Sequence, residues 1–185
     1  IYMALLFPPA GPWVYESKLP KPRDAGNHTI KSLIEYSSND ITTDANTSTA
    51  LEELYKLLVE FDIIDSLEDL NDRFTVLAPN TNAFIGYNAT FKTLIDSQKE
   101  KFLKSHVVLG RFDINDINEL VRTNKEVRTL SGTVLKFYKD NAGDLYVLAK
   151  DNISKIINPD FLARNGVIHH LESVLEVLDP SVLPD

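Results

Sequence analysis

The sequence contains no cysteine among its 185 residues, and this absence removes several classes of function at once. A thiol nucleophile, a disulfide framework and a thiolate metal site are all excluded. The absence does not assign the chain to the cytosol, because a domain of this size can be stable in a secretory compartment without disulfides. Glycine is scarce as well. Seven glycines leave little room for a phosphate-binding loop, and no such loop, nucleophile elbow or Rossmann turn is present.

Basic residues are in the minority, with 19 Lys and Arg against 27 Asp and Glu and a net charge of -8. Phosphate binding depends on clustered cations, so the sequence predicts no nucleic-acid partner and no electrostatic docking onto anionic membranes. The apolar stretch Ile1–Phe7 is far shorter than the roughly 20 residues that a membrane-spanning helix needs. We therefore expect contact with a membrane only through an anchor outside this chain.

Residues suited to catalysis or metal binding occur without the spacing that such sites need. His169 and His170 are adjacent, and neighbouring residues of a strand point to opposite faces, so the two side chains cannot easily chelate one metal ion. His28 and His106 have no ligand spacing with them. The acidic cluster from Glu60 to Asp69 has helical spacing and is interpreted as a solvated face rather than as paired catalytic carboxylates. The sequence thus predicts no catalytic residues, no metal site and no cofactor.

Length and patterning predict one main domain. Residues 1–26 are rich in proline and are interpreted as an extended arm or the tail of a preceding segment, 27–180 as a single domain, and 181–185 as a C-terminal tail. Apolar residues recur at helical spacing in the first half, and two capping boxes, Thr49–Glu52 and Ser97–Glu100, mark helix starts. The second half alternates with period two, as strands do. This segregation predicts an α+β fold.

Several blocks stand in an order that is typical of one family. Phe74–Pro79 is predicted to be a short strand ended by proline, and a helix capped by Asn80 or Thr81 follows it. Further along come the helix end Phe102–Gly110, the turn Thr129–Gly132, and the strand entry Asn165-Gly166-Val167-Ile168-His169. From Asn27 to Pro180 the chain resembles the fasciclin-like domain family.

The resemblance implies a wedge of two β-sheets, a β-sandwich, with helices packed along one side. It also implies a non-enzymatic adhesion or scaffolding module of a secreted, cell-surface or vacuolar glycoprotein. The expected partner is a protein or a glycan, and self-association is possible. The alternative is a carrier that holds a small apolar ligand in a cleft between helices and sheet, which a large apolar pocket would favour.

Two residues of the Asn165 block are predicted to be structural. Gly166 is expected to adopt the positive φ that a tight turn into a strand often needs, and Asn165 to tolerate that turn. His169 stands between Val167 and Leu171 on one face of the predicted strand. Burying an unsatisfied imidazole would be costly, so we expect its ring nitrogens to bond backbone groups and the residue to act as a latch.

The candidate binding residues are Asn158, Asp160, Phe161, Leu162 and His106. Asn158–Leu162 resembles an adhesion pentapeptide of the family, and Ser105-His106 stands where many animal members have Tyr-His, a dipeptide associated with integrin binding. Because the tyrosine is missing, we expect a partner other than an integrin, or self-association. Asn158, Asp160 and His106 are expected to form a solvent-facing edge. In the other interpretation, Asp160 caps a turn while Phe161 and Leu162 fill the core.

Four sequons bear on the compartment, since N-glycosylation occurs in the secretory pathway. They begin at Asn27, Asn46, Asn88 and Asn152. Asn46 is the favoured acceptor because its surroundings are polar and lack a regular pattern, whereas the strand expected after Ile153 restricts access to Asn152. We expect at least one of the four to carry a glycan.

Overall fold

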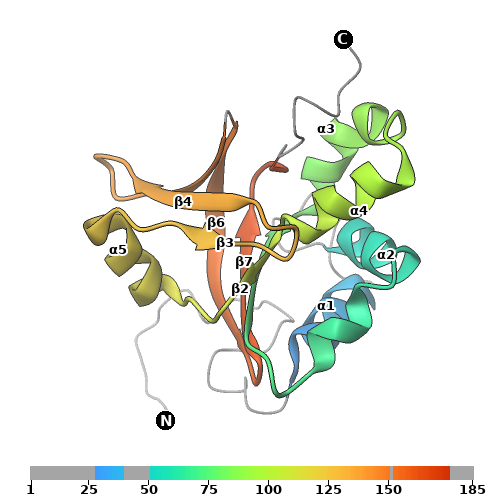
Figure 1. Ribbon diagram of the computed structural model, residues 1–185, viewed down its shortest axis with the longest axis horizontal. Helices are drawn as coiled ribbons and strands as arrows, with labels where there is room; N and C mark the ends of the chain where they lie inside the picture. The colour runs from blue at the N-terminus through green and yellow to red at the C-terminus, as the bar shows by residue number, and fades with distance from the viewer. Residues whose placement is uncertain (1–27, 40–50, 151, 176–185) are drawn as a thin grey trace.

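A computed structural model describes residues 28–39, 51–150 and 152–175 of the chain (Figure 1). The predicted arm 1–26, the tail 181–185, the sequon residues Asn27 and Asn46, and Thr49 of the first capping box lie outside these ranges. The helices are α1 (Ile30–Asn39), α2 (Glu52–Glu60), the short 3-10 helix η3 (Ile64–Glu68), α3 (Thr81–Phe91), α4 (Asp96–Lys104) and α5 (Ile114–Thr123). The strands are β1 (Phe74–Pro79), β2 (Val107–Leu109), β3 (Val127–Arg128), β4 (Val134–Lys139), β5 (Leu145–Ala149), β6 (Asn152–Ala163) and β7 (Gly166–Leu171).

The strands form one seven-stranded sheet in the order β2-β1-β7-β6-β5-β4-β3. Only β1 and β7 pair in parallel, and every other neighbouring pair is antiparallel. An isolated bridge between Val108 and Thr129 connects the region of β2 to the other edge of the sheet. The sheet is therefore bent until it nearly closes into a barrel.

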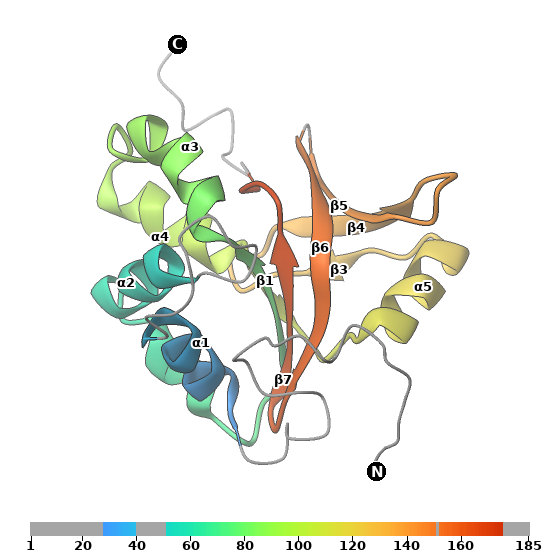
Figure 2. The same cartoon turned by 180° about the vertical axis from the view of Figure 1, so that it is seen from behind.

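The expected division into two separate sheets is not seen, although the expected α+β class is confirmed. The reason lies in β6, which is 12 residues long. Its first part, Asn152–Lys155, pairs with β5, and its later part, from Ile156 to Ala163, pairs with β7. The long strand β6 thus pairs with both halves of the sheet, β2-β1-β7 and β5-β4-β3, and hydrogen bonding continues from one half to the other (Figure 2).

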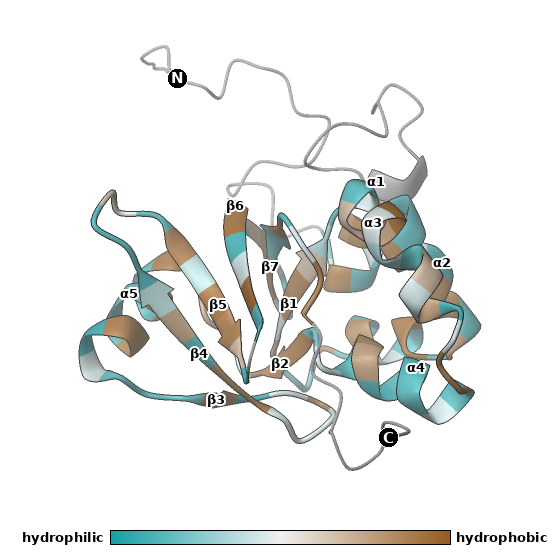
Figure 3. Ribbon diagram, turned by 90° about the horizontal axis from the view of Figure 1, so that it is seen from above, coloured by the Kyte–Doolittle hydropathy of each residue, from teal (hydrophilic) through white to brown (hydrophobic). Residues whose placement is uncertain are grey.

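Two apolar cores lie on the two faces of the bent sheet. The first joins α1–α4 to β1 and β7 and is centred on residues such as Ile30, Leu54, Phe102 and Ile168. The second lies inside the bend, where Leu77, Leu135 and Val147 meet Ile117 of α5. Figure 3 shows α1–α4 gathered on one side of the strands and α5 beside β4 and β5 on the other. The expectation of helices along one side holds for α1–α4 and fails for α5.

Helix starts follow local chemistry. The Asn80 side chain accepts from the Ala83 N–H at 2.9 Å and caps α3, one of the two residues expected to do so. The predicted box Ser97–Glu100 is wrong by two positions, because α4 begins at Asp96 and Gln98 accepts from the Ile95 N–H. Of the helices described, none is long and apolar enough to span a bilayer.

Candidate binding surface and the latch behind it

The pentapeptide Asn158–Leu162 forms an irregular part of β6. The register of β6 against β7 shifts on both sides of Asn158, so residues 157–160 bulge out of the regular ladder. Pro159 at the bulge is exposed and has no N–H to leave unpaired, while Asp160 adopts a left-handed φ of 64°. The bulge gives this segment a backbone shape that differs from that of a regular strand, with Pro159 exposed at its centre.

His169 holds this bulge from behind. Its Nδ1 accepts from the Asp160 N–H at 3.1 Å, and its Nε2 lies 2.7 Å from the Phe112 carbonyl oxygen, to which it donates. The ring is fully buried, and this burial lowers the pKa of His169 so that the neutral tautomer persists. His169 thus connects β6 to the segment before α5 through two backbone groups, which is the contact pattern expected of a latch.

Two further side chains fix the same segment before α5. Thr75 Oγ1 donates to the Gly110 carbonyl and accepts from the Phe112 N–H, both at 2.8 Å. The Asp160 carboxylate accepts from the Ile114 N–H at 2.8 Å, at the first residue of α5. The N-cap Asp113 accepts from the Asp116 N–H, and this bond lowers the pKa of the Asp113 carboxyl. The Asp160 side chain therefore takes part in capping α5 and is not simply a solvent-facing group.

Phe161 and Leu162 lie on opposite faces of β6. Phe161 pairs with Ile168 and packs against the helix-side core, where its ring meets His170 edge to face at 4.6 Å. Leu162 pairs with Val167 and is half-buried. Phe161 therefore agrees with the interpretation that its side chain fills the core, whereas Leu162 is not among the residues of either apolar core.

His170 is buried on the face opposite to His169. Its Nδ1 donates to the Asn158 carbonyl at 3.3 Å, whereas its Nε2 has no hydrogen-bond partner among the described residues. Desolvation lowers the pKa of His170 to about 4. A cavity of about 10 Å³ borders the ring together with Leu33, Leu51, Phe161 and Ile168.

His106 does not join the predicted edge. It is 1% exposed, its Nδ1 donates to the Phe102 carbonyl at 2.9 Å, and its Nε2 accepts from the Leu175 N–H at 3.0 Å. It directly precedes β2, and β1 and β7 lie between β2 and β6, so it is three strands away from the bulge. The expected solvent-facing edge of Asn158, Asp160 and His106 is therefore wrong in its third member. Desolvation lowers the pKa of His106 to about 4.

Gly166 occupies its position for a reason other than the expected positive φ. Its φ is not in the left-handed region, and the residue is the first of β7, opposite Phe74. A Cβ at Gly166 would lie 1.9 Å from the Phe74 carbonyl oxygen and 2.7 Å from Ile30 Cδ1. The glycine is needed because a backbone and a helix side chain approach where a side chain would be.

Asn165 is the residue whose role sequence reasoning missed. It does not occupy the left-handed region either. Its buried side chain accepts from the Ile30 N–H at 2.9 Å and donates to the carbonyls of Leu67 and Asp69 at 2.8 and 3.0 Å. One amide thus joins the first turn of α1, η3 and the entry to β7. The only local signal was an Asn before Gly, which is equally typical of an ordinary turn.

The two sequons within the described residues differ in access. Asn88 and Thr90 are exposed on α3. In the other sequon, Ser154 is buried and its hydroxyl donates to the Ser173 carbonyl at 2.7 Å, and the Asn152 amide oxygen is buried. Geometry therefore favours Asn88.

The alternative interpretation, a ligand carrier, needs a large apolar cleft between helices and sheet. The cavity between helices and sheet, beside His170, has a volume of about 10 Å³, enough for one water molecule at most. An open groove of about 220 Å³ lies between α2 and α3, lined by Leu57, Phe84, Ile85, Phe91, Glu53 and Asn88. Drug-sized ligands usually occupy roughly 300–1,000 Å³. Among the described residues, no group of three His, Asp or Glu side chains is placed to hold a metal ion.

Comparison with known proteins agrees with this architecture. The structure is similar to a FAS1 domain pair from the insect cell adhesion molecule fasciclin I, with a TM-score of 0.66 and 16% sequence identity. The match covers 84% of this chain and 52% of that one, so the present chain corresponds to about half of the pair. A search of curated protein sequences gives no match.

A family model gives the assignment at the level of sequence. The model of the fasciclin domain matches residues 49–177, which include β1 to β7 and every helix except α1. Fasciclin domains are generally non-enzymatic adhesion modules found in extracellular or cell-surface proteins. The chain belongs to the fasciclin domain family.

Proposed function

We propose that this domain is an adhesion or scaffolding module of a secreted, cell-surface or vacuolar glycoprotein, and that it binds a protein or glycan partner through the β6 bulge. The observation that carries the proposal is the bulge itself. Asn158–Asp160 departs from the regular ladder, Pro159 is exposed, and the backbone is held by His169 and by the cap that Asp160 gives to α5. An exposed segment whose backbone is already held in place loses little conformational entropy on binding.

The test separates binding from stability. Asp160→Ala removes the cap on Ile114 and is expected to cost about 1 kcal/mol of unfolding free energy, so it cannot report on binding alone. Asn158→Ala/Pro159→Ala changes the bulge and leaves the Asp160 side-chain and backbone bonds in place. Lys92→Ala, at the C-terminal end of α3, is the matched exposed control.

Attachment of cells or extracellular matrix to a surface coated with each variant is measured alongside the melting temperature. We expect the double variant to lose most of the attachment while its melting temperature stays within about 2 °C of the original. Lys92→Ala should attach normally. Full attachment by a folded double variant would show that the bulge is not the binding surface.

A further inference from the structure

The outer face of β3–β6 is a second exposed surface, and it combines cations with exposed apolar side chains. Arg128, Lys136 and Lys155 point outward there, together with Val134, Tyr138 and Ile153, which are 37, 41 and 51% exposed. We call these six residues the basic face. The inward side chains of the same strands, such as Leu135 and Val147, belong to the core that contacts α5. Among the described helices, none covers the basic face.

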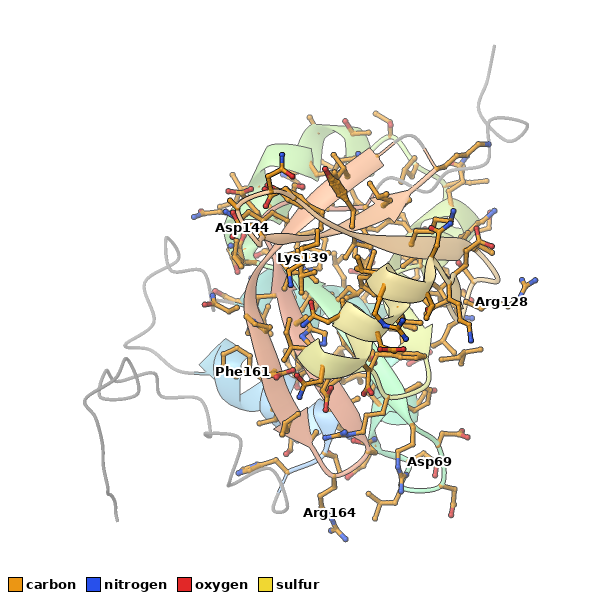
Figure 4. The ribbon with its side chains drawn as sticks, turned by 90° about the vertical axis from the view of Figure 1, so that its left-hand side faces the viewer. Asp69, Arg128, Lys139, Asp144, Phe161 and Arg164 are labelled. Atoms are coloured by element: carbon orange, nitrogen blue, oxygen red, sulfur yellow. The ribbon has the colours of Figure 1, made fainter. Side chains whose placement is uncertain are left out.

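The charge of the basic face is opposite to that of the chain, which has a net charge of -8. Lys155 lies 3.4 Å from Asp144 at the rim of the face. Arg128 and Lys136 make no ion pair with any described residue, and the Arg128 side chain points away from the molecule (Figure 4). Two cations without ion pairs beside three exposed apolar groups form a surface that fits an acidic partner with apolar groups of its own.

Such a surface exists on the same chain. The segment from the end of α2 through η3 to the start of β1 carries exposed carboxylates, two exposed aliphatic side chains and one exposed cation, Arg73, which donates to the carbonyls of Leu70 and Asp72. We call this segment the acidic edge, with Val59, Glu60, Asp62, Asp69, Leu70 and Asp72 as its members. Val59 and Leu70 are 44 and 45% exposed. Within the described ranges none of the four carboxylates makes an ion pair, since Lys31 is bound to Asp65 and Glu68 instead.

The two surfaces belong to different parts of the molecule. In Figure 1, α2 lies among the helices on one side, and β4 lies on the other side, beyond β7. Within one copy, no ion pair joins a described residue of the basic face to one of the acidic edge. A contact between two copies through these surfaces is heterologous, and it leaves one free surface of each kind for further copies.

We propose that the basic face of one copy binds the acidic edge of a second copy, so that domains associate head to tail. This inference rests on the proposed adhesion function and names a partner for it. The basic face spans about 14 Å along β4 and about 14 Å across β3–β6, at roughly 3.4 Å per residue and 4.8 Å per strand. A contact centred on so small an area is weak between single molecules and becomes effective when many copies are displayed together.

The experiment therefore uses beads densely coated with the domain and measures their clumping. The basic-face variant is Arg128→Glu/Lys136→Glu, and the acidic-edge variant is Glu60→Lys/Asp72→Lys. The matched control is Lys92→Glu/Lys101→Glu, which reverses one cation directly after α3 and one on α4, both outside the two surfaces. Melting temperatures verify that all variants are folded.

We expect beads carrying the original domain or the control to clump, and each surface variant alone to clump about tenfold less. A mixture of the two surface variants should clump again, because the acidic-edge variant supplies an intact basic face and the basic-face variant an intact acidic edge. About 0.5 M salt should weaken all clumping, since the contact is electrostatic and screened.

Failure of the mixture to clump, or undiminished clumping of either variant alone, overturns the head-to-tail contact. Attachment of the same beads to cells or matrix distinguishes this outcome from failure of the adhesion function. Beads that attach without clumping overturn the head-to-tail contact only. Beads that neither attach nor clump overturn both proposals.

Discussion

The β1–β7 centre of this domain and the outer face of β3–β6 differ in how their side chains are bonded and exposed. In the centre, Asn165 uses its amide for three backbone bonds, Gly166 has no room for a methyl group, and both nitrogens of His169 are bonded. On the outer face, Tyr138 and Ile153 remain 41 and 51% exposed, and Lys136 makes no described ion pair. The centre leaves nothing for a partner to bind, so its residues serve stability. The proposed recognition surfaces are the exposed bulge and the basic face.

The largest expected effect is the loss of unfolding free energy in acid. His106 and His170 are buried and neutral, and desolvation lowers the pKa of each from 6.5 to about 4, while burial also lowers that of His169. The unfolded chain therefore binds protons at a higher pH than the folded one. Stability is fully present above about pH 6.5 and is lost as the pH falls toward 4, by about 3 kcal/mol for His106 and about the same for His170.

Urea unfolding between pH 7.5 and 4.5 measures this loss. His170→Leu removes one of the buried titrating groups. The slope of its unfolding free energy against pH should therefore be smaller, by an amount that corresponds to up to one proton taken up on unfolding. Equal unfolding free energies at pH 7 and pH 4.5 in the original protein would show that these histidines are not kept neutral by burial.

Gly166→Ala should have the next largest effect. The added methyl group would lie 1.9 Å from a backbone oxygen of β1, which cannot move without disrupting the parallel β1–β7 pair. We expect a loss of roughly 4 kcal/mol or a failure to fold. Gly86→Ala is the matched control, since a Cβ there meets nothing within 4 Å on exposed α3. It should be neutral or stabilise by up to about 1 kcal/mol. Similar urea midpoints for the two variants would contradict the close approach at Gly166.

His169→Ala should have an intermediate effect of roughly 1–3 kcal/mol, because the Asp160 N–H and the Phe112 carbonyl lose their partner in a buried place. Amide hydrogen exchange locates the damage. We expect faster exchange at Asp160 and in the first turn of α5, with α3 and α4 unchanged. An unchanged melting temperature would refute the latch.

The smallest effect on stability is expected from glycosylation, because the acceptor side chain is exposed. In material from a eukaryotic secretory host, peptide mass spectrometry after glycosidase treatment should find Asn88 modified more fully than Asn152. The exposed Asn88–Thr90 segment can carry a glycan without loss of packing, and the melting temperature should change by less than about 2 °C. Occupancy of Asn152 with an unmodified Asn88 would contradict this order.

Local patterns predicted much of the fold. The period-two alternation of the second half predicted strands, and the structure contains β4 and β5 there. Asn80 was one of two residues expected to cap the helix after β1. These signals depend on neighbours within a few residues, which is why they were accessible. The predicted start of α4 at Ser97 was wrong by two positions. The N-cap is Ile95, because the Gln98 side chain accepts from the Ile95 N–H.

For the candidate site, sequence reasoning found the segments but not their arrangement. Asn158–Leu162 was singled out, and the structure makes it a bulge. The predicted position of His106 next to Asn158 and Asp160 was wrong because it depends on strand order. The strands β1 and β7, which come from distant parts of the chain, lie between β2 and β6. Asn165 was missed because its partners, Ile30, Leu67 and Asp69, are about a hundred residues away in sequence.

The sequence by itself determined the α+β class, the short strand ended by proline, the absence of thiol chemistry and the blocks that mark the family, because each follows from composition or from residues close together in the chain. Only the tertiary structure decided why residue 166 is glycine, where the three buried histidines find their partners, and how β6 joins two halves into one bent sheet. Those outcomes depend on contacts between segments far apart in sequence, and such contacts are set by strand order and packing rather than by local propensity.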